Sequence, residues 1–282
     1  MTKRKTLEEL TLKNSFMFGA VMSDEENCRL LLERILEVPI ATVTVSKEKS
    51  IVYHPGYKGV RLDVYAEDLE DTRYNIEMQV LKEPNPGKRS RYYHSQMDME
   101  LLASGTNYGE LPRAYVIFIC DYDPFGFGKY RYIFRHRCEE DGTVELQDES
   151  QTIFLSTCGS NEDEVPEALV KFLKFVKADL QESEEDFGDY YVERLQEYIQ
   201  QVKQSREMGE RFMLFEELLE TERTQALVKE RRETIFEFLE DLGTVPEDLK
   251  EDILQEEELQ ILKAWVKVAA HAKSIEEFME NM

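Results

Sequence analysis

The spacing of apolar residues changes once along the chain, close to residue 160. Before that point, runs rich in β-branched and aromatic residues predict one strand or two at 41–53 and further strands at 60–66, 73–81, 113–121, 129–137 and 152–157. The run RAYVIFICD at 113–121 is apolar almost throughout, which is typical of a central strand covered on both faces. The first part of the chain therefore alternates strands with helices.

Helical spacing predicts the other elements. One helix begins at Ser23, which has Glu26 at capping-box spacing, and a second covers 89–104. After residue 160 the chain is helical, with long amphipathic helices over 189–242 that end at Gly243. We expect an α/β domain at 1–160 followed by an all-helical region at 161–282.

The stretch RLDVYAEDLEDTRYNIEMQV at 61–80 predicts a hairpin with polar residues in unusual places. Its even positions are apolar, whereas its odd positions carry Asp63, Glu77 and Gln79. Two apolar faces that share one core require opposed residues with an even sum, and a turn near Glu70 gives a sum of about 140. Asp63 then faces Glu77 at a Cβ separation of about 5 Å, with Gln79 farther along the same face.

Two facing carboxylates repel each other unless a cation lies between them. Mg²⁺ suits one or two carboxylates, and the backbone carbonyl of Met78 offers a further oxygen. Such an ion polarises a phosphoryl oxygen and lowers the pKa of an attacking water. The alternative is a solvated odd face, on which Arg61 pairs with Glu77 and no catalysis occurs.

The residues around this hairpin resemble a known family. Asp63 followed by Glu77-Met78-Gln79 is similar to the Asp…Glu-x-Lys/Gln core of the PD-(D/E)XK nuclease superfamily. Phe16-Met17-Phe18, Tyr92-Tyr93 and Gly105-Thr106-Asn107-Tyr108 resemble the Rpn family of recombination-promoting nucleases and transposases. The resemblance covers roughly residues 10 to 157, and the helical remainder resembles the variable C-terminal region of the family.

This resemblance implies a mixed, mostly four-stranded sheet flanked by helices, and hydrolysis of DNA phosphodiesters with Mg²⁺, or with Mn²⁺ in its place. Asp63 and Glu77 would bind the metal with the Met78 carbonyl, and these acids with Gln79 would form the catalytic set. Gln79 stands where many superfamily members have a lysine, and Leu62 stands where their proline precedes the aspartate. A neutral Gln orients water but supplies no positive charge.

Further residues are candidates for the same site. Lys82 is a candidate to replace the missing lysine, and Glu33 is a candidate for the acid that superfamily members often place on a helix. The alternatives are a core-side Lys82 and a solvent-exposed Glu33. At the start of the helix after Gly87, the predicted contacts to DNA phosphate are Lys88, Arg89, Arg91 and Tyr92.

The net charge of −24 limits how this chain can bind DNA. Residues 161–282 hold 15 basic and 33 acidic residues, a balance of −18, which leaves −6 for residues 1–160. Such a chain needs a local basic patch or metal ions to approach phosphates. The four cysteines form no metal-binding pattern, and we find no secretory signal or membrane span, so we expect a cytoplasmic protein.

The sequence therefore predicts a metal-dependent DNA endonuclease linked to recombination or transposition. The alternative is a catalytically weak or inactive interaction protein derived from a transposase. The acidic helices pack on the nuclease domain or pair with a second copy to form a homodimer, and the sequence leaves both arrangements open.

Overall fold

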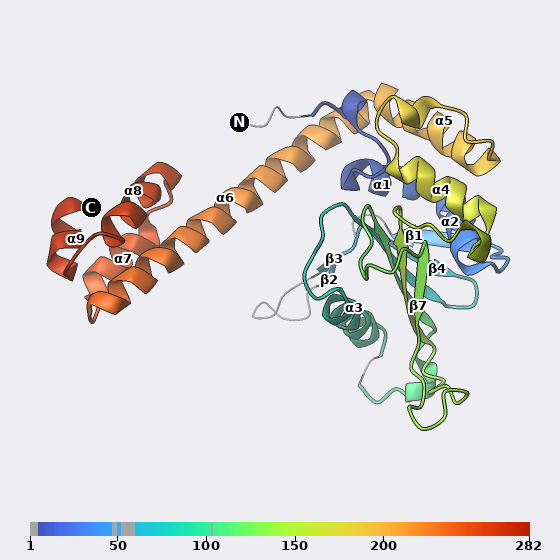
Figure 1. Cartoon of the computed structure of the whole chain (residues 1–282), viewed down its shortest axis with the longest axis horizontal. Helices are drawn as coiled ribbons and strands as arrows, with labels where there is room; N and C mark the ends of the chain where they lie inside the picture. Colours follow the sequence, from blue (N-terminus) through green and yellow to red (C-terminus); the bar gives the residue numbers. More distant parts are fainter. Residues whose placement is uncertain (1–4, 47–49, 52–59, 103) are drawn as a thin grey trace. The chain divides into compact units, whose positions relative to one another are not determined.

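The computed structural model describes residues 5–46, 50–51, 60–102 and 104–282 (Figure 1). Part of the segment 41–53, where we expect one strand or two, therefore lies outside the described residues, and so does the side chain of Arg61.

The chain divides into two compact units, residues 1–209 and 210–282. The first unit extends beyond our expected boundary at residue 160. The reason is that two helices after that boundary, α4 (Glu167–Lys177) and α5 (Tyr190–Gln204), pack with α1 (Ser15–Met22) and α2 (Glu25–Leu36) of the same unit. Their apolar faces carry fully buried side chains such as Phe172 and Tyr191.

A six-stranded mixed sheet forms the centre of the first unit (Figure 1). Its strands, in spatial order, are β1 (Val43–Ser46), β4 (Val64–Asp68), β5 (Arg73–Gln79), β6 (Ala114–Cys120), β8 (Ser150–Ser156) and β7 (Arg131–Phe134). The inner strands β5, β6 and β8 run parallel, and antiparallel strands are added at both sides. The sheet is therefore wider than the mostly four-stranded one implied by the family resemblance. The strands β2 (Ser50–Ile51) and β3 (Val60–Arg61) form a separate ladder.

Helices cover the two faces of the sheet unequally (Figure 1). One face carries α1 (Ser15–Met22), α2 (Glu25–Leu36), α4 and α5, and the other carries α3 (Pro86–Leu101). Short 3-10 helices occur at Leu7–Glu9, Tyr108–Glu110, Glu162–Glu164 and Glu182–Glu184. We call the side of the sheet under α3 the α3 face.

Strand β6 is the central strand that its sequence predicts, with every residue from Ala114 to Cys120 buried. Its even positions pack under Tyr93 and Met97 of α3. Because successive side chains point to opposite faces, the odd positions face the other helices. The register places Glu77 opposite Phe118, which assigns Glu77 to the α3 face.

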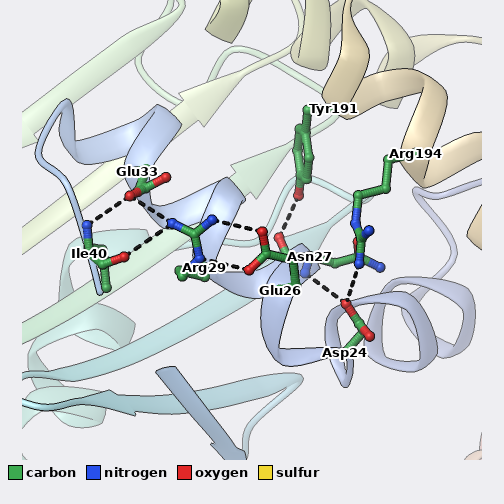
Figure 2. Close-up of polar contacts among 8 residues, drawn as sticks. All are labelled: Asp24, Glu26, Asn27, Arg29, Glu33, Ile40, Tyr191 and Arg194. Carbon is green, nitrogen blue, oxygen red and sulfur yellow. Dashed lines mark hydrogen bonds and ion pairs between the residues drawn. The ribbon is translucent and has the colours of Figure 1, made fainter. Parts of the chain in front are cut away.

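The helix expected at Ser23 begins one residue later. Asp24 is its N-cap, because the Asp24 carboxylate accepts from the Asn27 N–H at 2.9 Å. Figure 2 shows how α5 holds this helix: Arg194 donates to Asn27 Oδ1 at 2.7 Å, and the Tyr191 hydroxyl donates to the Asn27 carbonyl at 2.8 Å. These buried contacts attach α5 to the first unit.

The second unit is helical, as the sequence predicts. The boundary between the units falls within α6 (Arg206–Leu242), which is followed by α7 (Glu247–Gln255), α8 (Leu259–Ala269) and α9 (Ile275–Asn281). The helix α6 ends directly before Gly243, whose φ of 151° suits glycine. Ser274 caps α9 by accepting from the Glu277 N–H, and Trp265 packs partly buried against the core of this unit. Among the described helices, none combines the length and apolarity that a bilayer span requires.

Asn75 is fully buried on the α3 face, and neither side-chain amide atom has a hydrogen-bond partner within the described residues. A buried amide without a partner costs about 1–3 kcal/mol. We therefore expect Asn75→Leu, which keeps the side-chain shape, to raise the free energy of unfolding in denaturant titrations by about 1 kcal/mol.

Asn27→Leu is the matched control, because Asn27 is equally buried but its side-chain amide makes two hydrogen bonds: it donates to the Val21 carbonyl at 3.2 Å and accepts from Arg194 at 2.7 Å. It should lower the free energy of unfolding by about 1–3 kcal/mol, since it leaves its partners unpaired. Destabilisation by Asn75→Leu would mean that the Asn75 amide has a partner in solution.

Candidate active site

The β4–β5 ladder stops at Asp63, which lies in a break between β3 and β4. The observed register pairs Val64 with Ile76 and Tyr65 with Asn75, so opposed residues sum to 140, as the hairpin pattern predicts. Helix α1 approaches closely here, since a Cβ added at Gly19 would lie 3.7 Å from the Asp63 carbonyl oxygen. The site therefore forms where one strand ends and a helix crosses it.

Two hydrogen bonds between side chain and backbone connect Asp63 with the Glu77-Met78 dipeptide. The Asp63 N–H donates to Glu77 Oε1 at 3.3 Å, and the Met78 N–H donates to Asp63 Oδ2 at 2.9 Å. We expected Asp63 and Glu77 to face each other directly in the ladder. The β4–β5 ladder ends before this pair, and the Asp63 side chain accepts from the Met78 N–H that a longer ladder would have bonded to backbone. The Glu77 carboxylate thus lies against the backbone of Asp63, and the Asp63 carboxylate lies against the backbone N–H of Met78, the residue after Glu77.

Glu77 is only 1% exposed, although it is an acid. Burial raises the pKa of the Glu77 carboxyl to about 8, and the charge of Asp63 acts in the same direction. Arg89 opposes this rise. The site thus binds a proton or a cation more readily than an ordinary surface carboxylate does.

The side chain of Arg89 reaches from α3 into this site. It donates to Gln79 Oε1 at 2.8 Å and to Glu77 Oε2 at 3.2 Å, and its Nε donates to the Tyr93 hydroxyl at 2.9 Å. The Tyr93 hydroxyl in turn donates to Glu77 Oε2 at 3.2 Å. The guanidinium also lies 5.2 Å from the centre of the Tyr93 ring. Arg89 is therefore held in place on several sides.

This arrangement contradicts the solvated-face alternative. Tyr65, Asn75 and Glu77 are all buried on the α3 face, because α3 covers it. The side chain of Arg61 lies outside the described residues, and the cation that pairs with Glu77 is Arg89. Sequence reasoning placed Arg89 only among phosphate contacts. The spacing of Arg89 and Tyr93 could have indicated this position, because residues four apart lie on the same face of a helix.

The alternating direction of the backbone groups along β5 determines the side toward which the Met78 carbonyl points. In β5 the odd residues bond to β6, as the Asp121 N–H to Gln79 carbonyl bond of 2.9 Å illustrates. The even residue Met78 therefore presents its N–H and carbonyl toward the β4 side, where its N–H meets Asp63. The carbonyl thus lies on the side where the acids meet, as a ligand should.

Glu33 is occupied elsewhere. Its carboxylate pairs with Arg29 at 2.8 Å and accepts from the Ile40 N–H at 2.8 Å, as Figure 2 shows. Neither partner belongs to the group around Glu77. The structure does not bring Glu33 to the Asp63–Glu77 pair, and its observed role is to tie the end of α2 to the following loop.

The remaining basic candidates lie at the surface. Lys82 follows the end of β5 at Gln79 and is exposed, so it is on neither face of the sheet. Lys88 and Arg91 are exposed in the first turns of α3, and Tyr92 is partly buried against the α3-face core. Among the described residues, Lys82, Lys88 and Arg91 have no ion-pair partner, which leaves their charge available to a ligand.

The donor set favours a hard cation. Within the described part of the chain, no three His, Cys, Asp or Glu side chains gather at one point. Two carboxylates and one backbone carbonyl remain, and all of these donors are oxygen. That set matches Mg²⁺, which takes few protein ligands and keeps water or phosphate oxygens in its other positions. The residues therefore fit a metal that the substrate helps to bind.

One comparison with known proteins identifies the chain. A family model described as PD-(D/E)XK nuclease family transposase matches residues 12–237. The match extends far beyond the hairpin and includes every residue of the site described above. No curated protein and no solved structure matches significantly.

The raised pKa of Glu77 makes stability depend on pH in the metal-free protein. The folded state holds a proton at Glu77 up to about pH 8, whereas the unfolded chain loses it near pH 4.5. Stability from this group is therefore complete below about pH 4.5 and is lost as pH rises to about 8.

We expect the free energy of unfolding, measured by denaturant titration in EDTA, to fall by about 2–4 kcal/mol more in the wild type than in Glu77→Gln over that range. The variant controls for the repulsion among the many other acids. Parallel pH profiles for the two proteins would contradict the assignment.

Proposed function

We propose that this chain, which belongs to the PD-(D/E)XK nuclease family transposases, hydrolyses DNA phosphodiesters as a metal-dependent endonuclease. The family itself implies a nuclease or transposase-related function, and a role in recombination or transposition follows from it. The observation that carries the proposal is the buried Glu77 carboxylate. It accepts a hydrogen bond from the Asp63 backbone, and its one ion-pair partner among the described residues is Arg89.

In this proposal Asp63, Glu77 and the Met78 carbonyl hold Mg²⁺, or Mn²⁺ in its place. The bound ion would polarise a phosphoryl oxygen and make water a better nucleophile. Hydrolysis adds the water oxygen to phosphorus and releases one sugar hydroxyl. Gln79 orients this water through its amide, whose oxygen already accepts from Arg89 at 2.8 Å. The buried site excludes bulk water, which strengthens every charge interaction within it.

Arg89 supplies the positive charge that Gln79 lacks. Without metal, the Arg89 guanidinium pairs with Glu77 and therefore competes with a metal ion for this carboxylate. If Glu77 bound a metal instead, the Arg89 guanidinium could keep its contact with Gln79 and donate to the scissile phosphate. The positive charge is thus carried by a residue of helix α3, whereas the lysine of many superfamily members lies on the strand that carries Glu77.

Contacts to the rest of the DNA are proposed for Lys88, Arg91 and Tyr92 at the start of α3. Two of these are exposed cations, and the chain as a whole is strongly acidic, so binding would be local and sensitive to salt. A homodimer through the C-terminal helices remains a proposal that sedimentation of the full chain would test.

Supercoiled plasmid should be nicked by the wild type in Mg²⁺ or Mn²⁺ and left intact in EDTA. Asp63→Asn and Glu77→Gln should each slow nicking by about 100-fold or more, because loss of a metal ligand removes several kcal/mol of transition-state stabilisation. Glu70→Gln is the matched control, since Glu70 is an exposed acid in the turn of the same hairpin, and it should nick at the wild-type rate.

Nicking that survives in both site variants would reject this site. A wild type that cleaves no DNA with either metal would favour the other candidate function, a transposase-derived interaction protein.

Arg89→Gln should have opposite effects on metal binding and on cleavage. Removal of the competing guanidinium should tighten Mg²⁺ binding, measured by calorimetry without DNA, by about 3- to 10-fold, while cleavage slows by about 10- to 100-fold. Arg91→Gln controls for the change in net charge and should leave the Mg²⁺ affinity unaltered, because Arg91 is exposed and makes no contact with Glu77 or Gln79 in the described structure. Weaker Mg²⁺ binding in Arg89→Gln would assign Arg89 a merely structural role.

A further inference from the structure

A cavity of about 440 Å³ opens on the α3 face, between the first half of α3 and the strands β7 and β8. Its lining includes Arg91 and His94 from α3, Phe134 and Arg135 from β7 and its continuation, and Phe154 from β8. All of these residues lie within the first unit. The metal-site residues line no part of it, so it is a separate feature of the same face.

Aromatic rings form the floor of the cavity. The Phe125 ring lies 5.1 Å from Phe134 and 5.1 Å from Phe154, and the planes of Phe125 and Phe154 are nearly perpendicular. Phe154 is buried, whereas Phe134 remains 47% exposed although it stands beside this aromatic cluster. An exposed ring over a packed aromatic base is a stacking surface for a flat ligand.

The charge of the lining has one sign. The chain holds 59 Asp and Glu residues, yet this cavity is lined by Arg91, Arg135 and His136 and by no acid. Arg91 has no ion-pair partner in the described structure, while His136 pairs with Asp148 at 2.7 Å and Arg135 lies 3.8 Å from Glu145. A neighbouring cavity of about 560 Å³ mixes basic residues with Glu145, Asp148 and Glu149. Only the first of these two cavities therefore complements an anion.

Neutral polar groups complete the lining. His94 is hydrogen-bonded to Thr152 at 3.2 Å and to Ser150 at 3.4 Å, and Ser90 is bonded to Thr152. Burial lowers the pKa of His94 to about 4, so this ring is uncharged at neutral pH. The cavity thus combines aromatic rings, hydrogen-bonding groups and cations at its edge. These features complement the base and the phosphate of a nucleotide.

The cavity lies within reach of the acids. Glu77, Phe118 and Phe154 are directly opposed on the adjacent strands β5, β6 and β8. Two strand spacings separate Glu77 from Phe154 by about 10 Å. Successive nucleotides in stacked DNA rise by roughly 3.4 Å, so this distance corresponds to about three nucleotides at most, and an unstacked strand covers it in fewer.

We propose that this cavity binds an unstacked nucleotide of the DNA substrate, with its base against Phe134 and its phosphate near Arg91 and Arg135. The inference rests on the proposed nuclease function and makes it more specific: the substrate has an unpaired base within about three nucleotides of the cleaved bond. Duplex DNA hides its bases inside the stack, so the cavity selects single-stranded segments, flaps or ends.

The test is binding of fluorescein-labelled oligonucleotides in Ca²⁺, measured by anisotropy. A single-stranded thymidine oligonucleotide should bind the wild type more tightly than a duplex of equal length. Phe134→Ala should weaken binding of the single strand by about 5- to 100-fold, the range for loss of one base stack. The same variant should have little effect on an oligonucleotide of abasic sites, which keeps the phosphates and lacks the bases.

Ile133→Ala is the matched control. Ile133 precedes Phe134 on β7 and is 45% exposed, but its side chain points to the opposite face. It should leave binding of all three oligonucleotides unchanged. If Phe134→Ala fails to fold, quenching of 2-aminopurine in an oligonucleotide bound to the wild type reports the same stacking.

Equal binding of single strand and duplex, equal loss with and without bases in Phe134→Ala, or unquenched 2-aminopurine would each overturn the inference. The two proposals fail separately. Plasmid nicking that depends on Asp63 and Glu77 without any base-dependent binding rejects the cavity alone, whereas base-dependent binding by a wild type that never cleaves rejects the nuclease alone.

Discussion

The buried carboxylate of Glu77 is the constraint around which the first unit is arranged. A charge in that position is costly unless a cation or a proton accompanies it. Three groups of the described structure stabilise the charge of Glu77: the Asp63 N–H donates to it, Tyr93 donates to it, and Arg89 reaches from α3 to pair with it. A purely structural sheet would gain more from an apolar residue here, so the retained acid points to a function that requires its charge.

Much of this arrangement was predictable from the sequence because it depends on periodicity. The register of the β4–β5 hairpin followed from the parity of apolar positions, and the unbroken apolar run identified β6 as the central strand. The packing of α3 over the odd-numbered side chains of the hairpin was not predictable. A loop separates α3 from the hairpin, and the place where the helix packs depends on the tertiary structure. Arg89 was therefore predicted only as a contact to DNA phosphate, although its side chain turns toward Glu77. Glu33 has the right residue type, but its neighbours Arg29 and Ile40 engage it instead.

The acidity of the chain and a role with DNA are compatible because charge is distributed unevenly. The excess of acids lies mostly after residue 160, while the α3 face collects the cations of α3 and of the segment after β7. One helix serves both features of that face. Arg89 and Tyr93 point to the acids, and Arg91 and His94 line the cavity, because residues two apart lie on different sides of a helix. The start of α3 is thus the element that would connect substrate binding to catalysis.

The central claim is that Asp63 and Glu77 together hold one divalent cation. Anomalous diffraction from crystals of the full chain soaked in Mn²⁺ tests it most directly, because the signal locates the metal without reference to activity. The account predicts a single strong peak between the two carboxylates and within bonding distance of the Met78 carbonyl, with the Arg89 guanidinium withdrawn from Glu77. A map without a peak there, in which Arg89 still pairs with Glu77 at saturating Mn²⁺, would contradict it.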